Sequence, residues 1–176
     1  LEDDVKKPRF SFYTPGRVCA AFIHDSSAAA SKWVYSHEYG RHILENFTDG
    51  QVRTLSYENV RTDGEVDQAV EDAVRRGANV IFTTTPKLLL SSVRQAALHP
   101  DVKILNCSLN TSYPSVRTYY PRLYGAKFIK GAIAGTLTRD GCIGYVADYP
   151  TYGSIASINA FAQGARMVNA NARIYL

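Results

Sequence analysis

The stretch RVCAAFIHDSSAAASKWVYSHEYGR, residues 17–41, decides the fold. Residues 18–23 form an almost continuous apolar run, which is typical of a parallel strand that is covered on both faces. Polar residues 24–27 then form a turn, and Ser31 can cap a following helix by accepting backbone N–H groups. In open α/β sheets, ligands bind where the carboxyl ends of strands meet the N-termini of helices. The turn and Trp33, in the first turn of this helix, therefore occupy the place where such a fold usually binds a ligand.

The same unit of strand and helix recurs along the first two thirds of the chain. Thr62 and Glu65 fit a capping box, and Pro86 suits the first position of a helix. Three units followed by a strand imply an α/β fold, a parallel sheet flanked by helices with right-handed crossovers. The expected strands are 18–23, 52–57, 79–82 and 102–107, and the expected helices run over about 31–47, 62–77 and 86–99. Their apolar helical positions are Val34, Tyr35, Tyr39, Ile43, Leu44 and Phe47, then Val66, Ala69, Val70, Ala73 and Val74, then Leu89, Leu90, Val93, Ala96 and Ala97.

The pattern changes after a loop at residues 110–114. We expect a short extended piece at 116–119, helices at about 121–137 and 153–168, and strands at 142–147 and 172–176. Apolar residues of these two helices are Leu123, Phe128, Ile129, Ala132 and Ile133, then Ile155, Ile158, Phe161, Ala162 and Ala165. Gly131 and Gly135 lie one turn apart and would let another backbone approach closely. The predicted organisation is a tail at 1–16, a first α/β lobe at 17–120, an inter-lobe helix at 121–141 and an incomplete second lobe at 142–176.

Composition indicates a globular domain and disfavours several classes of protein. Of the 176 residues, 45% are hydrophobic and 20% are charged, which suits a packed core. The net charge of +4 is scattered, whereas nucleic-acid binding predicts a concentrated basic stripe. No apolar run approaches the roughly 20 residues that span a bilayer. The charged start of the chain is no signal peptide and has no Met, so we expect a processed product from which any leader or anchor has been removed.

The sequence predicts neither a cofactor nor catalysis. Cys19, Cys107 and Cys142 form no C-x-x-C pair and are interpreted as buried thiols. His37 and His42 are five residues apart, which is the wrong spacing for a shared metal site on a helix. The glycine-rich phosphate-binding motifs and the G-x-S-x-G nucleophile motif are absent. We therefore expect no cofactor, no metal and no enzyme.

Four fragments in order resemble the basic membrane protein family, the PnrA-like and Med-like substrate-binding proteins of ABC importers. The first, WVYSHEYGR, is similar to an aromatic-led first helix with a Gly seven residues after the aromatic. GANVIFTTT with ALHPDVKIL is similar to the third strand, third helix and fourth strand of the family. SVRTYYPRLYGAKFIKGAIAG is similar to its inter-lobe helix, and GCIGYVADYP with INAFAQGARMVNANARIYL to the start of its second lobe. The resemblance covers residues 17–176.

This resemblance implies a type I periplasmic-binding-protein fold whose two lobes close on a small polar ligand, with nucleosides as the best-known ligands. It also implies an ABC permease as partner and an extracytoplasmic location, with a membrane-anchored lipoprotein as the parent protein. Several positions depart from the family pattern. Ala30 stands where members usually place a ligand-binding Asp, Val34 follows the aromatic in place of Asn, and Pro86 and Leu90 replace an aromatic and an acidic residue.

Each candidate ligand-binding residue has a structural alternative. Trp33 could stack on a planar ring or pack as a core aromatic. The Asp25, Ser26 and Ser27 side chains could bind a ligand or only form the turn. For Thr84 and Thr85 the alternative is helix capping. Asp148, with Tyr149 and Tyr152 near it, follows a second-lobe strand and could face the ligand or belong to a plain loop. Tyr119 and Tyr120 lie at the end of the predicted first lobe, where we expect the hinge between the lobes.

Three functions stay open at this point. The first is a solute-binding protein, the second is a sensing or interaction domain with a degenerate pocket, and the third is an α/β enzyme. If these 176 residues are the whole chain, its unfinished sheet edges should pair with another copy, giving a homo-oligomer, or be covered by a rearranged helix.

Overall fold

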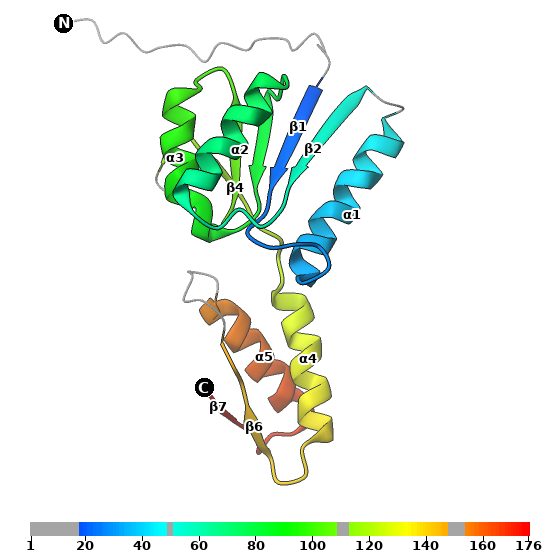
Figure 1. Ribbon diagram of the computed structural model, residues 1–176. Helices are drawn as coiled ribbons and strands as arrows, with labels where there is room; N and C mark the ends of the chain where they lie inside the picture. Colours follow the sequence, from blue (N-terminus) through cyan, green and yellow to red (C-terminus); the bar gives the residue numbers. More distant parts are fainter. Residues whose placement is uncertain (1–17, 49–50, 109–112, 148–153) are drawn as a thin grey trace, which may run out of the picture. The chain divides into compact units, whose positions relative to one another are not determined.

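The structure, a computed structural model, describes residues 18–48, 51–108, 113–147 and 154–176 (Figure 1). The chain divides into two compact units. The first comprises Leu1–Asn106 and Tyr113–Val116, and the second comprises Cys107–Ser112 and Arg117–Leu176. The lobe boundaries proposed from the sequence stay predictions.

A parallel sheet forms the centre of the first unit. Its strand order is β2-β1-β3-β4-β5, and β1 is parallel to both of its neighbours. The elements of the first unit are β1 (Val18–Ile23), α1 (Lys32–Phe47), β2 (Val52–Tyr57), α2 (Asp63–Arg75), β3 (Val80–Thr83), the 3₁₀ helix η1 (Pro86–Leu88), α3 (Leu89–Leu98) and β4 (Lys103–Cys107). The last strand in the sheet order, β5 (Arg117–Tyr119), belongs to the second unit. This arrangement confirms the predicted α/β fold with a parallel sheet flanked by helices.

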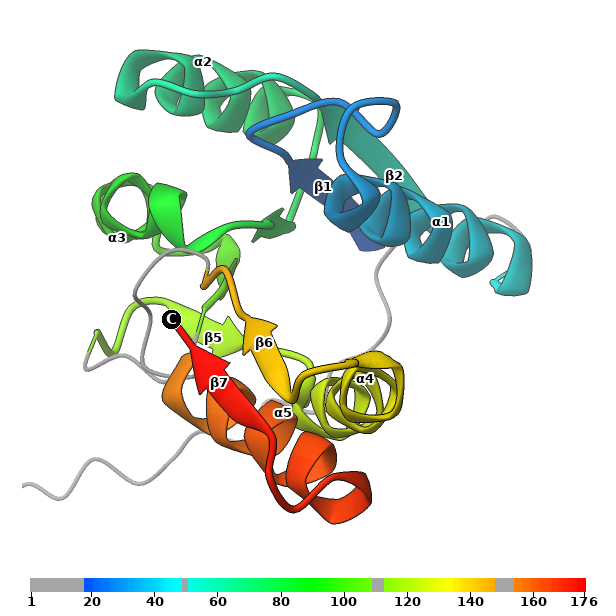
Figure 2. The same cartoon turned by 90° about the horizontal axis from the view of Figure 1, so that it is seen from below.

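The two faces of this sheet differ in chemistry. Ala21, Ile23 and Leu55 point to one face, where they join buried side chains of α2 and α3 in the main apolar core. Successive strand residues point to opposite faces, so Thr54 and Ser56 lie on the other face, where α1 packs. Figure 2 shows α1 and α2 on opposite sides of β1 and β2. Phe22 lies on this second face too, by the same alternation, and the polar residues beside it become important for the candidate site.

The helix ends form as their sequences predict. The Ser31 hydroxyl accepts a hydrogen bond from the backbone N–H of Val34, and Thr62 and Glu65 complete the capping box of α2. Gly77, which follows α2, has φ +89°, a conformation that favours glycine. These local signals explain why the starts of α1 and α2 agree with the prediction to within a residue.

The second unit consists of two closely packed helices and a two-stranded parallel sheet. Its elements are α4 (Tyr124–Leu137), β6 (Cys142–Gly144), α5 (Ser154–Val168) and β7 (Arg173–Tyr175). A Cβ atom added at Gly131 would lie 1.9 Å from the carbonyl oxygen of Phe161. One added at Gly164 would lie 2.0 Å from the carbonyl oxygen of Phe128. The close backbone approach predicted at Gly131 is therefore confirmed.

Several burial predictions are wrong. Cys142 is exposed, because β6 alternates and turns Ile143, not Cys142, toward the small core. Leu90 is 69% exposed because the buried face of α3 carries Ser91, Ser92 and Gln95 instead. Ala97 and Ile155, which were also predicted to face inward, are exposed. Six further apolar helix positions lie exposed as well: Tyr35, Tyr39, Ile43, Phe47, Ile129 and Ile133.

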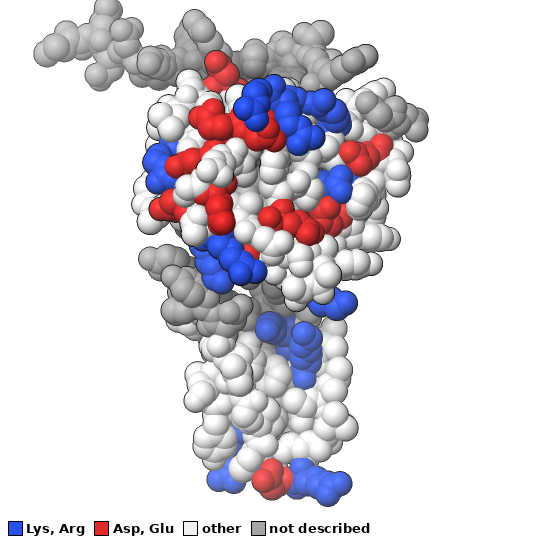
Figure 3. Space-filling view, in the orientation of Figure 1, with Lys and Arg blue, Asp and Glu red and all other residues white. Residues whose placement is uncertain are grey.

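Acidic and basic side chains lie side by side on the face of the first unit seen in Figure 3. Ion pairs within the first unit join Arg75 to Asp72 and Arg94 to Asp67. Within the described ranges, no helix is long and apolar enough to span a membrane.

Candidate functional site

The candidate site begins where two neighbouring strands end. Ile23 of β1 pairs with Thr83 of β3, so the next residues, His24 and Thr84, meet at the carboxyl edge of the sheet. The His24 Nδ1 atom lies 2.9 Å from Thr84 Oγ1, and both side chains are fully buried. The backbone N–H of Thr84 also donates to the Ile23 carbonyl at 3.0 Å. This edge is where open α/β sheets bind ligands.

Trp33 reaches the same edge from the first turn of α1. Its indole Nε1–H donates a hydrogen bond to the Thr84 carbonyl at 2.7 Å. The His37 ring lies one helical turn further on, with its centroid 5.0 Å from that of Trp33, and His37 Nδ1–H donates to the Trp33 carbonyl at 2.9 Å. Trp33 is only half-buried. Because its N–H is already donated to Thr84, any contact of the indole with a ligand would be made by the ring and not by the N–H.

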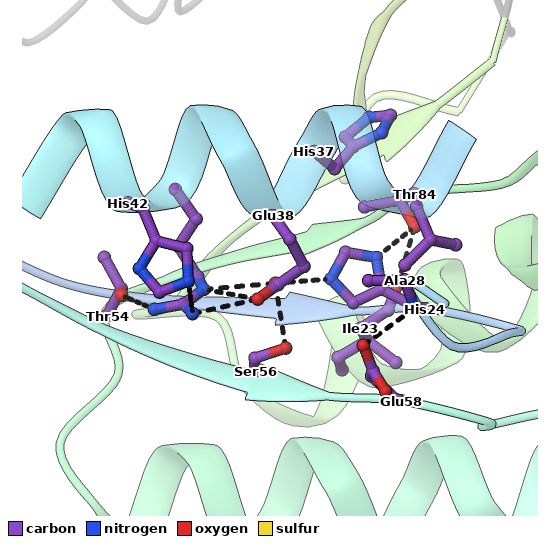
Figure 4. A network of polar contacts seen from close by, with 12 residues as sticks. Ile23, His24, Ala28, His37, Glu38, His42, Thr54, Ser56, Glu58 and Thr84 are labelled. Carbon is purple, nitrogen blue, oxygen red and sulfur yellow. Dashed lines mark hydrogen bonds and ion pairs between the residues drawn. The ribbon is translucent and has the colours of Figure 1, made fainter. Parts of the chain in front are cut away.

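A polar network under α1 holds this edge in place (Figure 4). The His24 Nε2 atom lies 2.9 Å from Glu38 Oε1, which also accepts a hydrogen bond from Ser56 Oγ at 2.9 Å. Arg41 donates from Nη2 to Glu38 Oε2 at 2.8 Å and from Nη1 to Thr54 Oγ1 at 2.7 Å. The network therefore crosses from α1 to both β2 and β1, and ends at Thr84.

The charges and hydrogen bonds of this network determine which of its groups are protonated. Burial opposes ionisation of Glu38, but hydrogen bonds from Arg41, His24 and Ser56 outweigh burial and lower its pKa to about 2. Burial lowers the pKa of His24 below its ordinary value, against the opposing effect of Glu38. At neutral pH, Glu38 is thus ionised and His24 neutral. Its Nε2–H donates to Glu38, and its Nδ1 accepts from the Thr84 hydroxyl.

The sequence interpretation did not identify this network. The signal was present in α1, because Glu38, Arg41 and Glu45 follow the buried Val34 at spacings of four, three and four residues. Residues at such spacings share one helix face. The sequence therefore contained a signal for a polar stripe on the buried side of this helix. The apolar residues at similar spacing favoured a different orientation of the helix.

The predicted turn residues lie at the same carboxyl edge. Asp25 Oδ2 is 3.6 Å from Lys87 Nζ, so Asp25 joins the end of β1 to η1. The Ser27 hydroxyl accepts from the backbone N–H of Ala30 at 3.3 Å, and Ser26 is half-buried in the same turn. The Thr85 hydroxyl caps η1 by accepting from the N–H of Lys87. Turn and cap chemistry thus engages Ser27 and Thr85, and their contact with a ligand stays a prediction.

Asp148, Tyr149 and Tyr152 lie outside the described residues, so their role as ligand-binding residues stays a prediction. Among the described residues, no group of three His, Cys, Asp or Glu side chains is arranged to hold a metal ion.

Asn106, another residue that the sequence interpretation missed, extends the polar edge to β4. Its Nδ2 donates to Thr83 Oγ1 at 2.8 Å and to the Thr85 carbonyl at 2.9 Å, and its side chain is fully buried. Within the described part of the chain, Oδ1 of Asn106 has no hydrogen-bond partner. Asn106 therefore fixes the segment after β3, to which Thr84 belongs.

Comparison with known proteins shows the family to which the chain belongs. Residues 17–176 match the model of the Bmp family, described as ABC transporter substrate-binding protein PnrA-like. This confirms the resemblance inferred from the four sequence fragments. The family is described as one of substrate-binding proteins rather than enzymes.

Relatives and solved structures point the same way. A purine-binding protein of Brucella abortus (strain 2308) is 28% identical over 153 residues, which cover 87% of this chain and 44% of the relative. A putative ABC transporter glucose-binding protein, TsgA13 of Haloferax volcanii, is 26% identical over 155 residues, covering 88% of this chain and 39% of the relative. The chain thus spans less than half the length of these curated relatives.

Among solved structures, an ABC transporter solute-binding protein from Conexibacter woesei superposes with a TM-score of 0.64 at 16% identity, covering 90% of this chain and 53% of that one. At this identity the likeness concerns the fold alone, which is of the periplasmic-binding-protein type. With a family model matched over residues 17–176, the chain belongs to the PnrA-like family of ABC transporter substrate-binding proteins.

Proposed function

We propose that this chain supplies the ligand-binding first lobe, and the start of the second, of an extracytoplasmic solute receptor for an ABC importer. Its ligand is a small polar molecule with a planar ring, of the nucleoside or purine class. The ring stacks on Trp33, and polar groups at the ends of β1 and β3 bind the rest of the molecule. Closure of the two lobes retains the ligand without a catalytic step.

The position of Trp33 carries this proposal. Trp33 is half-buried at the carboxyl edge of a parallel sheet, with its N–H donated to the Thr84 carbonyl. An aromatic side chain held in this way presents a ring surface suited to stacking. The name of the Brucella abortus relative, a purine-binding protein, supports a planar ligand. The name of the Haloferax volcanii relative makes a sugar the competing ligand class.

The proposed partner is an ABC permease, to which the loaded receptor delivers its ligand. We place the parent protein outside the cytoplasm as a membrane-anchored lipoprotein, as in the family resemblance described above. Asp25, Ser26, Ser27, Thr84, Thr85 and Asp148 are proposed to supply the hydrogen bonds to the ligand.

A ligand panel tests this function. Thermal unfolding is followed with purine and pyrimidine nucleosides, free bases, sugars and amino acids, because a ligand that prefers the native state raises the apparent stability. We expect a purine nucleoside or base to give the largest rise. The Trp33→Ala variant should bind it about 5- to 150-fold more weakly, since stacking a base on an aromatic is worth about 1–3 kcal/mol.

Trp33→Phe should retain most of the affinity, because it keeps an aromatic face. Tyr39→Ala is the matched control, since Tyr39 is an exposed aromatic of the same helix that contacts Tyr35 rather than the sheet edge. A rise with sugars and none with nucleosides or bases would overturn the ligand class. No rise with any compound would overturn the receptor function.

A specific observation favours the second candidate function, a sensing or interaction domain with a degenerate pocket. Ala30 is exposed and has no polar side chain at the position where the family resemblance predicts a ligand-binding Asp. Restoring the carboxylate separates the two functions. If Ala30→Asp creates binding of a nucleoside that the natural chain does not bind, the pocket has degenerated. If the natural chain already binds the nucleoside, the pocket has not degenerated.

A further inference from the structure

We propose that His24 is a positioning residue for the ligand site, which sets the orientation of the Trp33 indole through Thr84. The importance of that orientation for ligand binding depends on the function proposed above. The contact chain itself can be tested without any ligand.

The chain of contacts is continuous from the middle of α1 to Trp33. Arg41 fixes the Glu38 carboxylate with two nitrogens, Nε and Nη2, at 3.0 and 2.8 Å. Glu38 in turn accepts from His24 at 2.9 Å, and His24 meets the Thr84 hydroxyl at 2.9 Å. Each side chain therefore restrains the next one, and the series ends on the residue that accepts the indole N–H of Trp33.

His24 is suited to this role because both ring nitrogens are engaged and the ring has no freedom to turn. Its side chain is fully buried, between Glu38 of α1 and Thr84 after β3. Thr84 Oγ1 also lies 3.2 Å from the Ile23 carbonyl, which is the competing acceptor for the single hydroxyl proton that Thr84 donates to His24 Nδ1. A fixed Thr84 side chain limits rotation of the Thr84 peptide, whose carbonyl receives the Trp33 indole.

Two pairs of variants separate positioning from simple stabilisation. In His24→Asn the side-chain amide lies where Nδ1 lay and can still meet Thr84, but it cannot reach Glu38. In His24→Gln the amide reaches the place of Nε2 and can still meet Glu38, but the contact with Thr84 is lost. Thr84→Val removes the hydroxyl, and Thr84→Ser keeps it. His24→Gln and Thr84→Val both break the contact between residue 24 and the Thr84 hydroxyl, and both are predicted to release the Trp33 indole.

The readout is direct because Trp33 is the only tryptophan in the chain. Its indole N–H gives a single tryptophan cross-peak in a proton–nitrogen correlation spectrum, and its fluorescence reports exposure. We expect His24→Gln and Thr84→Val to shift the indole cross-peak toward the position of a free indole and to increase fluorescence quenching by acrylamide. His24→Asn and Thr84→Ser should keep the natural cross-peak and quenching.

His99→Gln is the control for the loss of a histidine, since His99 contacts Glu71 away from this edge. Far-UV circular dichroism shows which variants fold, and if His24→Gln does not fold, the Thr84 pair alone decides. An unchanged indole cross-peak in folded His24→Gln or folded Thr84→Val would overturn the positioning role. The same result follows if both members of a pair shift it equally.

For a ligand identified in the panel, His24→Gln and Thr84→Val should weaken binding by about 5- to 10-fold, the effect of roughly one hydrogen bond. If the cross-peak moves as expected but the natural chain binds no ligand, the positioning role holds and the receptor function fails. If the natural chain binds its ligand and the cross-peak does not move, the receptor function holds and the positioning role fails.

Discussion

Glu38 shows how a single carboxylate organises the candidate site. Its two oxygens accept hydrogen bonds from three different elements, through Arg41 of α1, His24 after β1 and Ser56 of β2. These contacts lower the pKa of Glu38 to about 2, whereas its ordinary value is 4.5. Since the folded state binds the proton less tightly than the unfolded chain, the stability that Glu38 contributes is present above pH 4.5. It is lost as the pH falls from 4.5 toward 2.

His24 acts in the same direction at a higher pH. Burial lowers its pKa below 6.5, so the unfolded chain takes up this proton before the folded chain does. The contribution of His24 to stability is therefore complete above pH 6.5 and decreases as the pH falls below that value. Both groups predict a first unit that loses stability progressively on acidification.

We predict that Glu38→Gln lowers the unfolding free energy of the first unit by about 1.5–3 kcal/mol at neutral pH, the usual cost of losing hydrogen bonds to a charged group. The difference from the natural chain should narrow as the pH falls from 4.5 toward 2. Urea unfolding followed by Trp33 fluorescence measures both effects. The control is Glu71→Gln, an exposed carboxylate on α2 that should change stability by less than about 0.5 kcal/mol. A constant difference between Glu38→Gln and the natural chain across this pH range would contradict the assignment.

At the scale of elements, α1 shows what the sequence could and could not reveal. The boundaries of this helix were predictable because Ser31 caps it and the apolar run of β1 ends at His24. The face that α1 turns toward the sheet was not predictable, because two different stripes of residues along the helix have helical spacing. One is apolar and exposed, with Tyr35 53% and Phe47 86% accessible, and the other is the polar stripe that contains Glu38.

The correct stripe is selected by what it meets in the sheet. The face of the sheet under α1 carries His24, Thr54 and Ser56, which complement a carboxylate and a guanidinium better than an aromatic ring. Which strand residues lie opposite a helix is a property of the assembled sheet, and hydrophobic periodicity along the helix does not encode it. Trp33 could be predicted as a candidate from its position at the start of α1. The role of His24 could not, because it depends on which side chains lie opposite one another in the assembled sheet.

The pair α4 and α5 gives a sharper test of packing. At Gly131 an added Cβ would lie 2.7 Å from the carbonyl carbon of Phe161, so even one methyl group must push the two backbones apart. We predict that Gly131→Ala destabilises the second unit by about 1–3 kcal/mol, the usual cost of overpacking. Amide hydrogen exchange in α4 and α5 should then accelerate by about 5- to 150-fold.

Gly125→Ala is the matched control on the same helix. An added Cβ at Gly125 has no neighbour within 4 Å, so the substitution should be neutral or gain up to about 1 kcal/mol from helix propensity. Equal exchange rates in Gly131→Ala and Gly125→Ala would show that α4 and α5 do not approach as closely as described.

At the scale of the whole molecule, the two units differ in the size of their buried apolar cores. The core of the first unit contains Ile23, Val70 and Ile81, which are completely buried between the sheet and its helices, and β1 has a hydrogen-bonded parallel neighbour on each side. The core of the second unit is a small cluster of Ile143, Phe161, Ala165 and Ala172. Since local opening becomes easier as buried contacts decrease, the two units should open with different free energies.

We predict that amides of β1 and β3 exchange with solvent much more slowly than those of β6 and β7, as measured by hydrogen–deuterium exchange on the intact chain. The physical reason is that β6 and β7 form a two-stranded sheet, which is marginal in water without further packing. The internal reference is β2, which borders β1 on one side only and should exchange at an intermediate rate. If β6 and β7 were protected as strongly as β1, the four-residue cluster could not be the source of their stability, and burial against additional structure would have to supply it.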